Sequence, residues 1–365
     1  MVITKMKGLN IGGLTSRIPI IQGGMGVGVS LSGLSSAVAN EGGIGVISAA
    51  GIGMDEPEFY SNFVDANRRA LKQQIQKARE ITKGIIGVNI MVAMSNFADT
   101  VKTAIDEKID IIFCGAGLAL NLPEFLTGSS TTKLVHIVSS GRAARLIAKI
   151  WSEKYNYVPD AIVVEGPMAG GHLGFKVEQI KDPQYSLENI VIDVINELKY
   201  FEEKFKKHIP VIAAGGIFSG ADIYKIMQLG ADGVQMGTRF VTTDECDASI
   251  NFKNSYIEAK KEDIAIINSP VGMPGRVIVN KFICDVNAGE KKPYTCPYHC
   301  INTCDYMKTS YCISVALMNA KKGFMENGFA FAGENVYKSN KITSVKQLIE
   351  TLEQEYVDAA MVDNI

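Results

Sequence analysis

The sequence predicts an α/β fold, a (β/α)8 TIM barrel with a smaller C-terminal lobe over the barrel mouth. Eight short apolar runs, typical of buried parallel strands, alternate with helical patterns. The last two runs each lead into a glycine-containing segment, Ala213–Ile217 and Gln235–Arg239. Loops after the seventh and eighth strands of such barrels commonly bind phosphate, so both observations indicate the same architecture.

The expected strands follow from uninterrupted apolar runs of four to six residues along the chain. Strict alternation with helices implies a parallel sheet, and eight units imply closure into a barrel. The strands are predicted at Ile18–Ile21, Ile44–Ser48, Ile85–Ile90, Ile109–Cys114, Leu134–Val138, Ala161–Val164, Pro210–Ala213 and Gly233–Met236.

Helical patterns fill most of the intervals between these strands. They cover Ser30–Asn40, Glu56–Thr82, Asn96–Glu107, Ser140–Glu153, Leu187–Phe205 and Gly220–Leu229, with only a short piece at Leu120–Leu126. The alternation stops beyond about Thr243. We therefore expect residues 1–245 to form the barrel and 246–335 a cysteine-containing lid lobe. Residues 336–365, with an amphipathic helix over Ser344–Tyr356, are expected to return to the barrel wall.

Composition and charge favour a protein that acts on a small molecule. The 365 residues are 47% apolar and carry a formal net charge of −2 with both signs intermixed, which leaves no basic face for nucleic acid. No secretory signal pattern and no run of about 18 apolar residues is found. We expect a cytoplasmic protein without a membrane partner, and the sequence leaves a homodimer open. Seven cysteines, one of them Cys114 within an apolar strand, argue against a secreted disulfide framework.

The two glycine segments predict a phosphate site. Backbone N–H groups approach a phosphate closely only where no Cβ intervenes, and a helix that begins just beyond adds its positive dipole end. Gly215, Gly216 and Gly237 provide such positions after the seventh and eighth strands.

Residues after the first and third strands indicate a site for a flat ring. Gly23, Gly24 and Met25 would let backbone amides approach a ring from one side, and a tight βα turn is an equally good explanation of this segment alone. Asn89 places a side-chain amide among apolar residues at the barrel mouth. A buried amide needs partners, which an isoalloxazine edge would supply, and a satisfied strand-end asparagine is the alternative.

His172 is the expected catalytic residue, because it lies in a glycine-rich loop after the sixth strand. Imidazole exchanges a proton near neutral pH. An isolated histidine is more often structural, but the position opposite the phosphate site favours catalysis. His136 lies within a strand, His208 ends a Lys-rich helix and His299 lies among cysteines, so these three are weaker candidates.

A cysteine run in the lobe has the spacing Cys296-x3-Cys300-x3-Cys304-x7-Cys312. Spacings of four predict three thiols on one helical face, with Pro297 in the first turn. Soft thiolates suit an iron–sulfur or zinc centre, but the spacing matches neither a Cys-x2-Cys zinc pair nor a ferredoxin run. Buried reduced thiols are the alternative.

These motifs together resemble the nitronate monooxygenase family, formerly called 2-nitropropane dioxygenases, and its relatives the flavin-dependent enoyl-ACP reductases. The resemblance covers most of residues 15–245, and Ser269–Arg276 looks like the family's link into the lobe. It is carried by Pro19–Met25, Gly87–Asn89, Glu165–Gly174, Ala214–Ile217 and Gly230–Phe240. The cysteine run between residues 284 and 312 is not part of the pattern.

The resemblance implies an FMN-binding barrel with the flavin phosphate on Gly215, Gly216, Gly237 and Thr238. The ring would lie near Gly24, Met25 and Asn89, with His172 as the base near the nitro-bearing carbon. The full cofactor-binding set implied is Gly23, Gly24, Met25, Asn89, Glu165, Gly170, Gly171, Ala214, Gly215, Gly216, Gln235, Met236, Gly237 and Thr238.

Three functions remain open from the sequence. The first is an FMN-dependent oxidoreductase that oxidises alkyl nitronates with O2, as the resemblance implies. The second is an NAD(P)H-dependent enoyl-ACP reductase, in which the Gly-Gly-His motif serves hydride transfer. The third is a redox- or metal-sensing module, in which the cysteine-rich lobe signals and the barrel is a scaffold.

Overall fold

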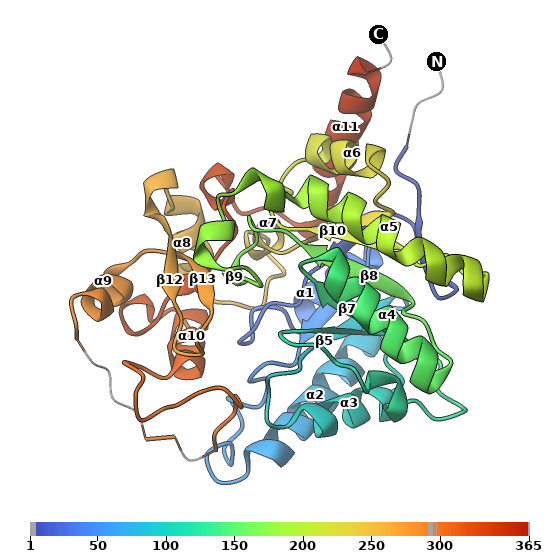
Figure 1. Ribbon diagram of the computed structural model, residues 1–365. Helices are drawn as coiled ribbons and strands as arrows, with labels where there is room; N and C mark the ends of the chain where they lie inside the picture. Colours follow the sequence, from blue (N-terminus) through green and yellow to red (C-terminus); the bar gives the residue numbers. More distant parts are fainter. Residues whose placement is uncertain (1–4, 291–294, 297, 364–365) are drawn as a thin grey trace.

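Eight parallel strands form a closed barrel in the computed structural model, which describes residues 5–290, 295–296 and 298–363 (Figure 1). The neighbours in order are β4, β5, β6, β7, β8, β10, β11 and β3. Hydrogen bonds from Gln22 N to Ile44 O and from Ile44 N to Ile20 O join β3 to the start of β4 and close the ring. The strands are β3 (Ile20–Gln22), β4 (Gly45–Ser48), β5 (Ile86–Met91), β6 (Ile111–Gly115), β7 (Lys133–Val138), β8 (Ala161–Glu165), β10 (Val211–Ala214) and β11 (Gly233–Met236). The predicted barrel is confirmed.

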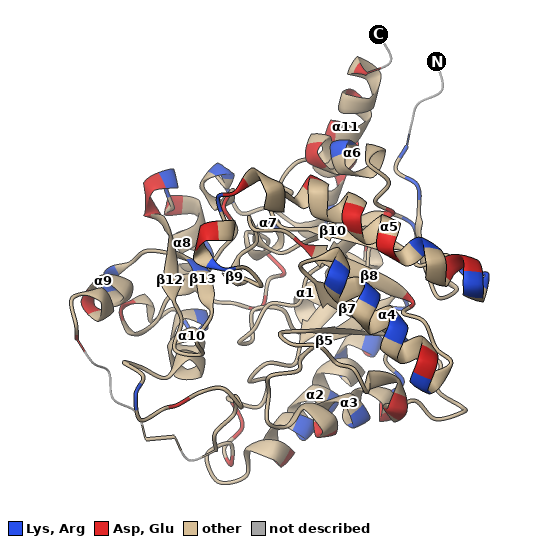
Figure 2. Ribbon diagram, in the orientation of Figure 1, with Lys and Arg blue, Asp and Glu red and all other residues tan. Residues whose placement is uncertain are grey.

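The helices surround this barrel, and most begin and end within a few residues of their predicted bounds. They are α1 (Ser32–Asn40), α2 (Phe63–Ile81), α3 (Phe97–Asp106), α4 (Gly141–Tyr155), α5 (Leu187–Phe205), α6 (Gly220–Gln228), α7 (Thr238–Val241) and the 3-10 turn η1 (Leu122–Phe125). Lys and Arg alternate with Asp and Glu over the outer helices (Figure 2).

Helix α2 departs from the prediction, because it begins at Phe63 rather than Glu56. Residues 56–61 form bends and turns instead. Phe59 is buried, and its ring centroid lies 4.7 Å from that of Tyr298 in the lobe. This aromatic contact directs the segment toward the lobe and overrides its helical pattern.

The barrel interior is filled by inward-facing side chains. Val46, Phe113, Val163 and Ile212 belong to one buried cluster. A hairpin of β1 (Leu9–Ile11) and β2 (Leu14–Ser16) adds Leu9 and Ile11 to that cluster. The hairpin therefore closes the amino-terminal end of the barrel and leaves the carboxyl end for a site.

The lobe packs beside the carboxyl ends of the strands. Its antiparallel sheet also includes β9 (Gly171–His172), which comes from the loop after β8 and pairs with β13. The lobe's elements are α8 (Ile250–Glu258), β12 (Ile264–Asn268), β13 (Pro274–Ile278), α9 (Lys281–Asn287), α10 (Ile313–Lys321) and β14 (Ala330–Phe331). The exact domain division at residues 246–335 stays a prediction.

The C-terminal helix α11 (Val345–Val362) packs against α6 (Figure 1). Ser344 caps it, since the Ser344 Oγ accepts a hydrogen bond from Gln347 N at 3.2 Å. The rings of Tyr224 and Tyr356 meet edge to face at 5.4 Å. Across the described ranges, no helix has the length and apolar character needed to cross a bilayer.

Candidate active site

A cavity of about 650 Å³ opens at the carboxyl ends of the barrel strands. This is the size of a typical small-molecule or cofactor site. Every residue that the sequence indicated for catalysis or cofactor binding lines it. They are Gly23, Gly24, Met25, Asn89, Glu165, Gly170, Gly171, His172, Ala214, Gly215, Gly216, Gln235, Met236, Gly237 and Thr238. The structure thus brings the whole set together, while the role of each residue stays a prediction.

The loops after β10 and β11 present backbone amides to the cavity. Gly215 and Gly216 have φ of +93° and +87°, a conformation that favours glycine. Within the described chain, the amides of Gly215, Gly216 and Gly237 donate to no other group. Helix α6 begins close by at Gly220, where Ser219 caps it. Unpaired amides beside a helix start suit a phosphate, because both place partial positive charge at one point.

Asn89, at the edge of the same cavity, depends on the absence of a side chain at Gly24. A Cβ on Gly24 would overlap the Cβ of Asn89. The carboxamide of Asn89 has no hydrogen-bond partner among the described residues. A half-buried amide of this kind is suited to the polar edge of a planar ligand.

His172 lies on β9, where the barrel loop joins the lobe's sheet. Its Nε2 lies 2.7 Å from the Oγ of buried Ser269, and its ring meets that of Phe331 at 5.0 Å. Burial lowers the pKa of His172 to about 4. The imidazole is therefore neutral at pH 7. Among the described residues, its Nδ1 has no hydrogen-bond partner and remains free for proton transfer.

Glu165 ends β8 and brings a carboxyl group to the same cavity. Burial raises the pKa of Glu165 to about 7. None of the described residues lining the cavity is Lys or Arg. The carboxyl therefore titrates near neutral pH and, when protonated, is a hydrogen-bond donor.

Arg276 and Ser269 are site residues whose roles the sequence did not reveal. The Nη1 of Arg276 donates to Pro167 O at 2.7 Å and to Ala169 O at 2.6 Å, and its Nε lies 2.8 Å from the carboxylate of Glu334. Arg276 thereby fixes the loop that carries His172. The segment Ser269–Arg276 was expected only as a link, since nothing local marks contacts to a loop about a hundred residues earlier.

The other histidines lie away from this cavity. His136 is buried in the barrel wall, where Ala119 N donates to its Nε2 at 2.9 Å. His208 contacts the carboxylates of Glu202 and Asp232 on the surface. His299 lies in the cysteine region, with its Nε2 2.9 Å from Cys304 O.

The cysteine run lies in the lobe, but the helical face predicted for it is wrong. Residues 298–312 form turns, bends and one β-bridge. Within this loop the backbone forms turn bonds, from Cys304 N to Ile301 O and from Lys308 N to Asp305 O. It also pairs with the barrel, since Ser95 N donates to Cys300 O and Asn302 N to Ala93 O. Pro297, predicted in a first helical turn, lies outside the described residues.

All seven cysteines are free. Cys114 is buried in β6, as its strand position predicts. Of the residues that the structure describes, no three His, Cys, Asp or Glu side chains are arranged to hold a single metal ion.

Comparison with known proteins identifies one matching family model and several similar proteins. A family model described as nitronate monooxygenase matches residues 9–355. A probable nitronate monooxygenase of Staphylococcus saprophyticus is 28% identical over 310 residues, 78% of this chain and 81% of the relative. A hydroxy-methyl-oxo-octahydro-indene-carboxyl-CoA dehydrogenase of Mycobacterium tuberculosis is 28% identical over 273 residues, 75% of this chain and 66% of the relative. The solved structure of FabK from Thermotoga maritima is 26% identical, with a TM-score of 0.73 and 96% of both chains covered.

Proposed function

Because this chain belongs to the nitronate monooxygenase family and is a flavin-dependent oxidoreductase, we propose that it binds FMN at the barrel mouth and oxidises alkyl nitronates with O2. The observation that carries the proposal is the neutral His172 at the edge of a cavity that also contains an unpaired amide cradle. These two features support a phosphate site and a base in the same cavity.

The residues present fit FMN. The amides of Gly215, Gly216, Gly237 and Thr238 would hold its phosphate, since these residues line the cavity and their N–H groups find no acceptor among the described residues. Gly23, Gly24, Met25 and Asn89 would lie along the ring, and Glu165, Gly170, Gly171, Ala214, Gln235 and Met236 would complete the contacts. When bound, the flavin would supply the redox chemistry that takes electrons from the nitronate and passes them to O2.

His172 would act as the base toward the carbon next to the nitro group. With a pKa of about 4 the imidazole is neutral at pH 7, and its Nε2 contacts Ser269. Nδ1 is left to accept a proton from a nitroalkane or to approach a nitronate without a competing charge. The Arg276 contacts to Pro167 and Ala169 keep this loop in place.

Glu165 would assist substrate binding by changing between its protonated and carboxylate forms near neutral pH. Since its pKa is about 7, a large fraction is protonated there and donates a hydrogen bond to an acceptor in the cavity. Above pH 7 the carboxylate would repel an anionic nitronate. We therefore expect the apparent affinity for the substrate to weaken as the pH rises through 7.

Oxygen consumption tests the proposal directly. The purified protein, loaded with FMN, is given ethyl nitronate or propionate 3-nitronate without any nicotinamide, and an oxygen electrode follows the reaction. Consumption that requires both FMN and nitronate is expected. A protein that binds FMN but consumes no oxygen with either substrate contradicts the nitronate proposal.

The second candidate is reduction of an enoyl thioester with NAD(P)H. One observation favours it: the Mycobacterium tuberculosis relative is named for a carboxyl-CoA substrate. Anaerobic bleaching of the flavin by NADH or NADPH would support this function. A nitronate monooxygenase that takes electrons directly from its substrate is expected not to respond.

A further inference from the structure

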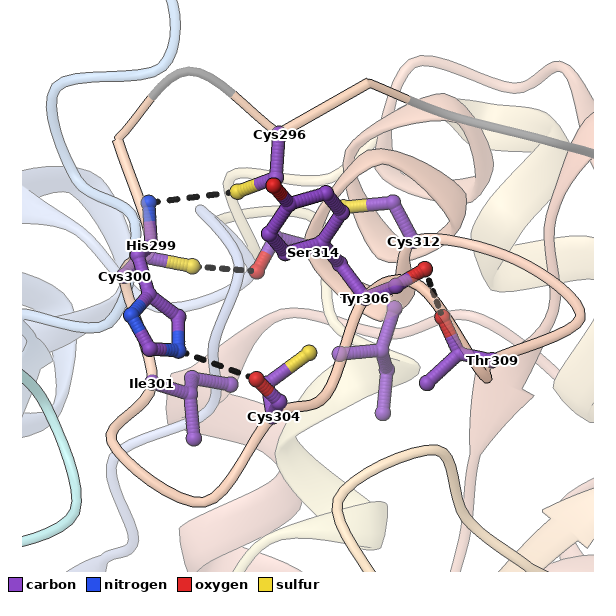
Figure 3. Close-up of a pocket in the computed structure, with 10 residues that line it drawn as sticks. Cys296, His299, Cys300, Ile301, Cys304, Tyr306, Thr309, Cys312 and Ser314 are labelled. Carbon is purple, nitrogen blue, oxygen red and sulfur yellow. Dashed lines mark hydrogen bonds between the residues drawn. The ribbon is translucent and has the colours of Figure 1, made fainter.

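Four of the seven cysteines gather around one small cavity in the lobe. Figure 3 shows the sulfurs of Cys296, Cys300, Cys304 and Cys312 pointing into the space between the loop and the start of α10. The other three thiols lie elsewhere: Cys114 and Cys246 are buried and Cys284 is exposed on α9. The cavity is about 20 Å³, and Tyr306, whose side chain also lines it, is 38% exposed and therefore has space to swing outward.

Two of these sulfurs lie within hydrogen-bond distance of neighbouring groups. The backbone N–H of His299 donates to the Sγ of Cys296 at 3.1 Å, and the Sγ of Cys300 lies 3.4 Å from the Oγ of Ser314. Hydrogen bonds to sulfur are a standard means of stabilising cluster thiolates.

Four thiols around one space suit an iron–sulfur cluster. The ligands of an iron–sulfur cluster bind different iron atoms and therefore stand apart around a shared space. We propose that Cys296, Cys300, Cys304 and Cys312 bind an iron–sulfur cluster, with Tyr306 displaced from the cavity.

The cluster would stand directly beside the large cavity. Ile301, Ile313 and Ser314 line both the cysteine cavity and the cavity at the barrel mouth. Ser314 contacts Cys300 on one side and faces the mouth on the other. A redox centre here would be separated from the barrel mouth by a single layer of side chains.

Anaerobic reconstitution tests the proposal in the full chain. The protein is incubated with ferrous iron, sulfide and a thiol reductant, desalted, and assayed for bound iron and acid-labile sulfide. We expect about four of each per chain, or about two of each for the smaller cluster. Reduction with dithionite should then produce an iron–sulfur electron paramagnetic resonance signal, which a flavin cannot produce.

Matched variants locate the cluster. Cys304→Ser and Cys312→Ser should lose most of the bound iron and sulfide, whereas Cys284→Ser, outside the cavity, should keep both. Circular dichroism and flavin binding at the barrel mouth show that each variant is folded. Wild-type protein that retains no iron or sulfide overturns the proposal. So does stoichiometric zinc in the purified protein, or an equal loss of iron in Cys284→Ser.

Discussion

The cavity at the barrel mouth and the cavity among the cysteines share a wall but are built from different parts of the chain. Strand ends and glycine turns form most of the first, so its shape is fixed by the barrel itself. Side chains of a loop and of one helix start form the second. The first cavity is therefore formed by the barrel, whereas the second has its four thiols in place but a volume of about 20 Å³.

The two cavities should respond to different kinds of substitution. At the mouth, changes in backbone freedom or in the single imidazole should alter cofactor binding and turnover. Among the cysteines, removal of one ligand should alter the metal content and leave the barrel intact. Substitutions at the barrel mouth test whether cofactor binding and turnover depend on the residues of that cavity.

The largest effect is expected from His172→Asn. Loss of the proposed base should lower turnover of an alkyl nitronate about 10²–10⁴-fold, because proton transfer by a positioned side chain contributes about that much. Flavin binding should be retained. His208→Asn, at a surface histidine, is the control and should keep wild-type turnover. Equal turnover in His172→Asn and wild type would remove His172 from the mechanism.

Acidification should destabilise the protein partly through His172. Its pKa is about 4 when folded and about 6.5 when unfolded. The unfolded chain therefore binds a proton that the folded chain does not, and stability falls as the pH drops from 6.5 toward 4. Urea unfolding measures this effect. Between pH 7 and pH 4, the free energy of unfolding of wild type should fall by up to about 3 kcal/mol more than that of His172→Asn. Identical losses would show that the imidazole is solvated.

Gly216→Ala should weaken FMN binding about 5–30-fold. An alanine at φ of +87° costs about 1–2 kcal/mol. The loop of the free variant therefore adopts another backbone conformation, and FMN binding must restore the original one. Gly13→Ala is the matched control, since Gly13 also has a positive φ, of +94°, but lies in the β1–β2 turn. Titration of FMN into the apoprotein, followed by flavin fluorescence, measures both. Equal weakening in the two variants would mean that the loop has no specific role.

The smallest effect is expected from Glu334→Gln. This residue pairs with Arg276 at 2.8 Å, but its side chain is 38% exposed, so the pair should contribute less than about 1 kcal/mol. Arg276 keeps its bonds to Pro167 and Ala169 in this variant. Thermal unfolding and turnover should both stay near wild type. A large loss of turnover would show that Glu334 itself positions the His172 loop.

Much of the barrel and its mouth could be predicted from the sequence, because short stretches of residues determine each strand and helix there. All eight apolar runs form barrel strands, and helix α5 has the predicted bounds, Leu187–Phe205. The residues that follow strand ends meet at one rim, which is why strand order alone groups Gly24, Asn89 and His172. Their roles, like the expected cytoplasmic location and any homodimer, remain predictions.

The features that the sequence did not predict depend on contacts between segments far apart in the chain. The spacing of Cys296, Cys300 and Cys304 indicated a helix, but pairing of this loop with residues 93–95 of the barrel replaced the helical hydrogen bonds. Ser269 and Arg276 carry no local signature, since their partners lie about a hundred residues earlier. Phe59 lies outside its predicted helix because it packs on an aromatic neighbour in the lobe.

The pairing of β9 with β13 couples His172 to the lobe mechanically. Gly275 lies opposite His172 and Arg276 opposite Gly171 in one antiparallel ladder. Any tilt of the lobe would carry the imidazole with it, so a tilt that widened the barrel mouth would also withdraw the proposed base. A barrel truncated to remove the lobe would lose the strand that holds His172, and with it the alignment needed for turnover.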